Sequence, residues 1–208
     1  MNKKTVILSC ISVIAVVIIL ITSQSAANPN EIVIPEVDLE QIEDLIIGSE
    51  PPKLIYADKT QVMFETTGGV YVYDMEDKSV VRSFDTASFA SERYPHVLQS
   101  SFATQDGKQL IFNFRDGPDL VAAYRYSFED NSINKLTKNE SRDYLNKRFE
   151  CKYPDPQDEL YHKASGTIAT ISSREYVYLT FQDWKVSTIN VVYVQDDQET
   201  VYNVFASK

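Results

Sequence analysis

The sequence predicts an all-β fold made of blade-like four-stranded antiparallel meanders, arranged as a partial or small β-propeller-like assembly. From residue 53 onward, short runs rich in Val, Ile, Tyr and Phe alternate with turns that contain Gly, Asp and Asn. In addition, "YVYDMEDKSVVRSF" at 71–84 and "YRYSFEDNSINKLT" at 124–137 both read Tyr-x-Tyr-x-x-Glu-Asp-x-Ser followed by an apolar residue. A looser third version begins at Val191. One supersecondary unit therefore occurs three times.

The predicted strands form three groups of four. The groups are KLIYA, QVMFET, GVYVYD and SVVRSF; then LQSSFAT, QLIFNF, LVAAYRYSF and SINKLT; then TIATIS, YVYLTF, TINVVYV and TVYNVF. In the two close copies of the repeat, the tyrosines lie on one face of a strand and are expected to pack between sheets, while the acidic pair lies in a solvated turn. These tyrosines are Tyr71, Tyr73, Tyr124 and Tyr126.

The number of units leaves closure of a ring open. The repeat recurs at uneven spacings of 53 and 67 residues, and three units fall below the usual minimum of about four blades. We therefore expect either a partly open assembly or a fourth sheet made from the segments around 85–97 and 140–165.

Three segments are expected to lie outside the strands. Residues 38–48 predict a short helix, with Asp38 as the cap and Gln41 at the capping-box position. Residues 85–96 are expected to hold one helical turn. The charged connector 138–166 is the longest, and long loops often carry function.

Residues 1–27 are predicted to be a membrane anchor or a signal peptide. Two lysines precede an apolar run at 5–22, whose 18 residues lie between the about 7–15 of a signal peptide and the ~20 of a membrane span. The positive start predicts that everything after the run is extracytoplasmic, in a single-pass cell-membrane protein. Cleavage near Ala27 would instead give a secreted protein.

The remainder divides into a linker with the short helix, 28–52, and an extracytoplasmic β-domain, 53–208. All 30 acidic residues but only 18 of the 20 Lys and Arg lie beyond the apolar run, so this part has a net charge of −12. Such a charge disfavours nucleic acid and anionic headgroups as partners. Cys151 is the only cysteine beyond the run, so an internal disulfide is not possible there.

Motifs for catalysis or metal binding are missing from the sequence. His96 and His162 are the only histidines and stand apart, without the short spacing that a zinc site requires. Ser132-x-x-Lys135 matches the nucleophile motif of penicillin-recognising enzymes, but it lies in a predicted strand, where these side chains point to opposite faces. The acidic turns lack a D-x-D-x-D-G calcium loop. We therefore expect a protein that is not an enzyme and needs no cofactor or metal.

Two turns are the candidate ligand-binding site. Trp184 and Asp183 lie in "QDWK" between two strands of the third unit. A tryptophan in a turn can stack on a sugar or anchor a protein partner. Arg115 and Asp116 occupy the equivalent turn of the middle unit. If one rim of the units carries the function, these two turns share it.

The segments LIYAD, GVYVYD, VVRSFD and DGKQLIF, together with two lysines before a single apolar run, resemble the outer C-terminal region of clostridial BlaR/MecR-type membrane proteins. The likeness covers about residues 1–137. Members of that group combine a membrane metallopeptidase with an outer sensor region that is often β-rich and propeller-like. This chain has no H-E-x-x-H and no acylatable serine motif in a helix, so the resemblance carries over no catalytic residue. It implies an outer domain with its anchor.

These expectations describe a non-catalytic binding or sensing domain, tethered outside a Gram-positive cell and engaging an envelope ligand or a membrane protein. A structural or assembly partner of a membrane complex is the alternative. A hydrolase is the second alternative, and it would require a cleft that contains a histidine.

Overall fold

The computed structural model describes residues 32–48 and 50–205. The predicted anchor at 1–27 lies outside the described residues. From Val33 onward the chain folds as one compact unit. Among the described residues, no helix has the length and apolar character needed to cross a bilayer.

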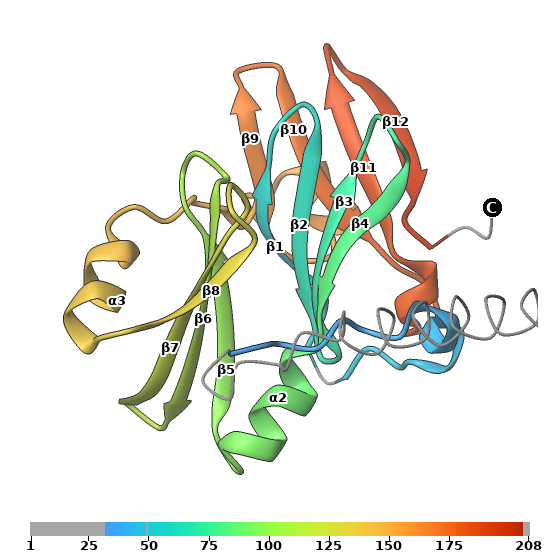
Figure 1. The fold of residues 1–208 in the computed structure, drawn as a ribbon. Helices are drawn as coiled ribbons and strands as arrows, with labels where there is room; N and C mark the ends of the chain where they lie inside the picture. Colours follow the sequence, from blue (N-terminus) through green and yellow to red (C-terminus); the bar gives the residue numbers. More distant parts are fainter. Residues whose placement is uncertain (1–31, 49, 206–208) are drawn as a thin grey trace, which may run out of the picture. The chain divides into compact units, whose positions relative to one another are not determined.

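The described residues contain three antiparallel sheets of four strands each (Figure 1). The first sheet holds β1 (Lys53–Ala57), β2 (Gln61–Thr66), β3 (Gly69–Asp74) and β4 (Ser79–Phe84); the second holds β5 (Leu98–Ala103), β6 (Gln109–Asp116), β7 (Asp119–Ser127) and β8 (Ser132–Leu136); the third holds β9 (Ile168–Ser172), β10 (Glu175–Thr180), β11 (Asn190–Gln195) and β12 (Gln198–Asn203). Strands that are consecutive in the chain are neighbours in each sheet, so the three predicted groups of four strands are confirmed.

The three sheets meet at β1. This strand contacts β5 of the second sheet and both β9 and β10 of the third. All its residues after Lys53 are buried, as is most of β3. Strands covered on both faces are apolar at nearly every position, which is how KLIYA and GVYVYD read. In contrast, β12 is exposed at most positions.

The tyrosines of the first repeat lie in the core between the first and third sheets. Tyr71 and Tyr73 are fully buried and belong to an apolar cluster with residues of β10 and β11. The ring of Tyr73 lies edge-on to that of Tyr202 in β12, with the centroids 6.2 Å apart. The predicted packing between sheets is confirmed here.

The second repeat places its two tyrosines differently. Tyr126 packs edge-on against Phe84 of the first sheet at 4.8 Å between centroids, which again joins two sheets. Tyr124 instead meets Phe89 of helix α2 (Thr86–Arg93), edge-on at 5.4 Å. One of the two therefore packs against a helix and not against a sheet.

Helix α2 connects the first and second sheets. Asp85 caps it, with its carboxylate accepting a hydrogen bond from the N–H of Ser88 at 2.8 Å. Aspartate at this position satisfies an N–H group that the first helical turn leaves free. The predicted helical turn is confirmed and continues to Arg93.

The expected fourth sheet does not form in the described part of the chain. Residues 85–97 and 140–165 instead hold α2, most of α3 (Lys138–Leu145) and α4 (Glu159–Lys163). Helix α3 begins with a capping box between Thr137 and Glu140, a T-x-x-E signal that the sequence carries. These segments are mostly polar and do not alternate, so they offer no apolar face for a sheet. The fourth-sheet alternative is wrong.

The segment 38–48 forms a 3₁₀-helix, η1 (Leu39–Asp44), which is shorter than predicted. Asp38 caps it as expected, accepting from the N–H of Glu40 at 3.0 Å. Gln41 does not complete a capping box, because its side chain donates to the Asp38 carboxylate at 2.7 Å.

Tertiary hydrogen bonds end η1 early. The N–H of Ile47 donates to the carbonyl of Trp184 at 2.7 Å, and the N–H of Val186 donates to the carbonyl of Leu45 at 3.0 Å. Since these bonds require an extended backbone, the residues before Gly48 pair with the 184–186 turn and leave the helix.

Residues 33–37, which we call the strap, lie against the first sheet. The N–H of Val37 donates to the Ser83 hydroxyl at 3.0 Å, and the N–H of Asp85 donates to the carbonyl of Pro35 at 2.6 Å. Ile34 and Val37 are buried. Part of the predicted linker therefore belongs to the folded unit.

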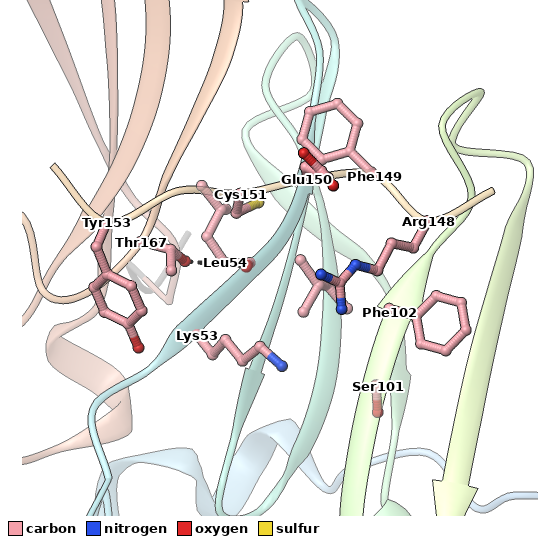
Figure 2. Close-up of a pocket in the computed structure, with 11 residues that line it drawn as sticks. Lys53, Leu54, Ser101, Phe102, Arg148, Phe149, Glu150, Cys151, Tyr153 and Thr167 are labelled. Carbon is pink, nitrogen blue, oxygen red and sulfur yellow. Dashed lines mark hydrogen bonds between the residues drawn. The ribbon is translucent and has the colours of Figure 1, made fainter. Parts of the chain in front are cut away.

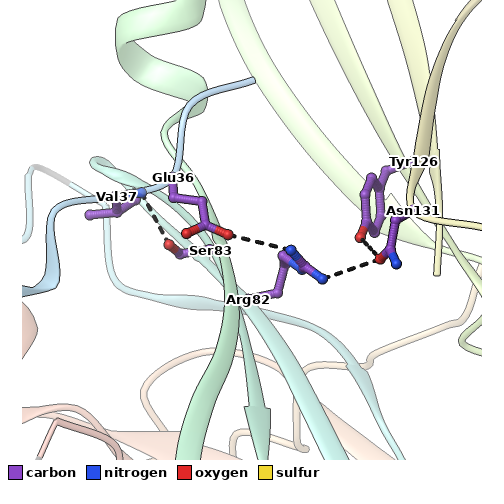
Figure 3. A network of polar contacts seen from close by, with 6 residues as sticks. All are labelled: Glu36, Val37, Arg82, Ser83, Tyr126 and Asn131. Carbon is purple, nitrogen blue, oxygen red and sulfur yellow. Dashed lines mark hydrogen bonds and ion pairs between the residues drawn. The ribbon is translucent and has the colours of Figure 1, made fainter. Parts of the chain in front are cut away.

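Arg82 links the strap to the second sheet (Figure 3). Its guanidinium contacts the carboxylate of Glu36 at 3.4 Å and the side-chain oxygen of Asn131 at 3.2 Å. The hydroxyl of Tyr126 donates to the same Asn131 oxygen at 2.6 Å. One arginine of β4 thus holds together groups from three segments.

Candidate functional site

A cavity of about 190 Å³ lies where β1 and β5 meet the long connector between the second and third sheets (Figure 2). Its walls are the start of β1, Ser101 and Phe102 of β5, residues 148–151 and 153 of the connector, and Thr167 before β9. The connector predicted to carry function therefore forms a large part of this wall.

The connector is held in place by backbone bonds to two sheets. The N–H of Phe149 donates to the carbonyl of Ala103 at 2.8 Å, and Lys152 and Ile168 exchange two backbone bonds of 2.8 and 2.9 Å. The ring of Phe149 also packs edge-on against Tyr56 of β1, 4.8 Å between centroids. These contacts fix residues 148–153 across the end of β1.

Two cationic side chains point into the cavity. Lys53 extends from the first position of β1 and Arg148 from the connector, and their charged ends face the same space (Figure 2). Among the described residues, neither forms an ion pair with a carboxylate within 4.0 Å. The cavity therefore holds positive charge in a domain whose overall charge is strongly negative.

Glu65 of β2 lies opposite Lys53 in the first sheet, as its cross-strand partner. Its oxygens accept hydrogen bonds from the Ser101 hydroxyl at 2.9 Å and from the Gln99 amide at 3.2 Å. Burial raises the pKa of Glu65, and the hydrogen bonds and the charge of Lys53 counteract that rise only in part. Glu65 thus connects the first sheet to β5 below the cavity.

This raised pKa leads to a prediction for stability. Because the folded chain binds the Glu65 proton more tightly than the unfolded chain, its contribution to the free energy of unfolding is greatest below the ordinary pKa of about 4.5 and falls as pH rises to the folded pKa. We expect Glu65→Gln to gain stability relative to the unmodified chain across this window. Urea unfolding of both proteins from pH 3.5 to 8 measures the difference, and a difference that does not change with pH would contradict the prediction.

Cys151 lies at the cavity wall as a free, partly buried thiol. Burial raises its pKa to about 12, although the charge of Lys53 acts in the opposite direction. The thiolate is the nucleophilic form of cysteine, so this side chain is poorly suited to attack a substrate at neutral pH.

A second cavity, of about 380 Å³, lies on the other side of Lys53. It is bounded by Glu65 and Thr66 of β2 and by Leu98 and Gln99 of β5. Lys53 therefore contributes to two neighbouring cavities between the first and second sheets.

The candidate residues predicted from sequence lie in two separate places, a turn after β10 and the end of β6. Trp184 is 50% exposed and packs edge-on against Phe181, with the centroids 5.1 Å apart. Asp183 and Trp184 both have positive φ, 52° and 53°, as the central residues of a type I′ turn do. The structure places the tryptophan at the surface, beside the end of the η1 segment.

Arg115 and Asp116 were predicted in a turn, but they are the last two residues of β6 and pair with Leu120 and Asp119 of β7, so only the two residues after them form the turn. The Arg115 guanidinium donates to the carbonyl of Pro118 at 3.1 Å, and Asp116 is exposed. No hydrogen bond or ion pair between described residues joins this turn to Trp184, and neither turn lines the two cavities above. Sequence reasoning did not select Lys53 and Arg148, because only the fold brings these distant cations together.

The residues considered for catalysis and metal binding are dispersed. His96 and His162 are both exposed, and Ser132 and Lys135 lie in strand β8. The acidic pairs of the repeats are in exposed hairpin turns, as predicted. In the ranges 32–48 and 50–205, no group of three His, Cys, Asp or Glu side chains is placed to hold a metal ion.

No family model matches this chain, and no curated protein matches it. The cavity at β1 is therefore the structural basis for the proposal that follows.

Proposed function

We propose that the three sheets are blade-like units of an open, propeller-like assembly, and that the chain is a non-catalytic binding or sensing module outside the cell. In this proposal the N-terminal apolar segment tethers the module, and an envelope ligand occupies the cavity at the start of β1. The contacts of β1 with β5, β9 and β10 support the propeller-like arrangement, since inner strands converge in a propeller.

The cavity lined by Lys53 and Arg148 is the observation that carries the proposal. It is a concave site formed by β1, β5 and the connector, and backbone hydrogen bonds hold the connector in place. Ligand sites are typically concave and place a few polar groups against apolar walls. Here the polar groups are two cations, and the apolar walls include Phe102 and Phe149.

The sequence adds support for the location. The apolar run at 5–22, the acidic outer part and the resemblance to BlaR/MecR-type proteins all favour a domain held at the outer face of a membrane. The resemblance also favours sensing over catalysis, because the segments that carry it contain no catalytic motif.

Thermal unfolding of the full-length chain against β-lactams, muropeptides, wall sugars and calcium tests the proposal. A ligand at about 100 times its Kd adds ~2.7 kcal/mol to the free energy of unfolding. For a domain of this size, that raises the midpoint by roughly 5–10 °C. A shift with one class identifies a binding module and the chemistry of its ligand.

If no compound of the panel raises the unfolding midpoint, the result would favour the second candidate, an assembly partner of a membrane complex. An exposed apolar pair supports this candidate: Ile46 is 71% exposed and lies in the segment that pairs with the turn of Trp184. Co-purification of a membrane protein, lost in Trp184→Ala but retained in the matched surface variant Tyr161→Ala, would establish it.

A further inference from the structure

We infer that the cavity at β1 binds an oxyanion, a carboxylate or a phosphate, carried by a small envelope component. The inference rests on the proposed function and specifies the ligand class of the same site. It assigns Lys53 and Arg148 as the binding residues.

Two like charges converge on this cavity. The ammonium of Lys53 and the guanidinium of Arg148 face one space, and no described carboxylate lies within 4.0 Å of either (Figure 2). Like charges that face each other repel, and an anion between them converts the repulsion into two favourable contacts. Arginine supplies a planar fork suited to carboxylate and phosphate, and lysine supplies a point charge.

The nearby carboxylates form no ion pair with Lys53 or Arg148 within the described ranges. Glu65 is occupied by hydrogen bonds from Gln99 and Ser101, with Ser101 donating through both its hydroxyl and its N–H. Glu150 also lines the cavity and, like Lys53 and Arg148, is exposed; it forms no ion pair within the described ranges. Its charge would discriminate against ligands with several negative charges.

The volume of the cavity limits the size of the ligand. A cavity of about 190 Å³ is smaller than the 300–1,000 Å³ that drug-sized ligands occupy. It therefore suits one acidic group with the part of a molecule next to it. Phe149 and Tyr153 provide aromatic surface at the wall, on which a sugar ring or an apolar stem can pack.

Matched probes test the inference on the full-length chain at constant ionic strength. N-acetylmuramic acid and N-acetylglucosamine share a sugar ring and differ in a lactyl group that carries a carboxylate; glycerol 3-phosphate and glycerol differ in a phosphate. Binding is followed by chemical-shift changes of the backbone amides of residues 148–153. We expect both acidic probes, or one of them, to bind at least tenfold more tightly than the neutral counterpart. Which acidic probe binds distinguishes a carboxylate source from a phosphate source.

Charge variants complete the test. Lys53→Gln with Arg148→Gln should weaken binding of the acidic probe at least tenfold. The control, Lys135→Gln with Arg142→Gln, removes the same charge from exposed positions on β8 and α3, and it should change binding less than twofold. Equal weakening in both double variants would mean that general electrostatics attracts the probe, and would overturn the assignment of the site.

The failure of this inference differs from the failure of the proposed function. If neutral and acidic sugars bind equally and the Lys53 and Arg148 variants have no effect, the anion assignment is overturned while a binding module remains. If none of the four probes shifts residues 148–153 and the wider panel gives no thermal shift, both are overturned.

Discussion

Replacing Phe64 with alanine should lower the free energy of unfolding by about 3–5 kcal/mol, the range for truncating a large buried aromatic side chain. Phe64 lies in β2 and is fully buried. Its ring stacks on Tyr71 at 5.2 Å between centroids and meets Phe205 edge-on at 6.4 Å. Alanine would leave a cavity at the centre of the cluster shared by the first and third sheets.

Thermal and urea unfolding of the full-length chain measure this loss. At about 2–4 °C per kcal/mol, the midpoint should fall by roughly 6–20 °C. Phe64→Leu keeps most of the volume and should lose clearly less. Val201→Ala, at an exposed position of β12, should change stability by no more than about 0.5 kcal/mol. A loss for Phe64→Ala as small as that of Val201→Ala would show that the two sheets do not share this core.

Gly69→Ala should cost about 2–6 kcal/mol, since overpacking costs about 1–3 kcal/mol and a disfavoured backbone conformation adds about 1–3 kcal/mol. Gly69 begins β3 with a φ of 156°. A Cβ atom there would lie 2.2 Å from the backbone carbonyl oxygen of Phe84. Because that oxygen belongs to the end of β4, the strand itself would have to move.

Gly117→Ala is the matched control for this second prediction. Gly117 also has a positive φ, 54°, but a Cβ atom there meets nothing within 4 Å. Its replacement should cost only the free energy of placing alanine at a positive φ, about 1–2 kcal/mol. The difference between the two variants in urea unfolding isolates the steric clash, and equal losses would contradict the close approach of β3 and β4.

The strands were predictable because their signals are local. Alternation of apolar residues, Gly and Asp in the turns, and the repeated tyrosine figure place all three meanders in the sequence. Helix α2 was also predictable from Asp85 as a cap. The end of η1 was not, because the bonds of Ile47 and Val186 that replace helical ones come from a segment far away in the chain.

The cavity was predictable only in part, for a similar reason. Length and charge singled out the connector 138–166, and residues 148–151 and 153 do form one wall. Lys53 is an exposed residue at the start of a strand, and nothing in the local sequence distinguishes it from other lysines. Its meeting with Arg148 depends on the packing of β1 against β5, which no local pattern encodes. The roles of Trp184, Asp183, Arg115 and Asp116 stay predictions.

The strap has a mechanical consequence. Its backbone is bonded to Ser83 of the first sheet and to Asp85 at the start of α2, and Arg82 contacts both Glu36 and Asn131, which precedes β8 of the second sheet. A pull on the chain before Val33 therefore loads these bonds and the buried Ile34 and Val37 before it loads any strand. Under tension, we expect the strap to detach from the first sheet before any strand separates from its neighbours.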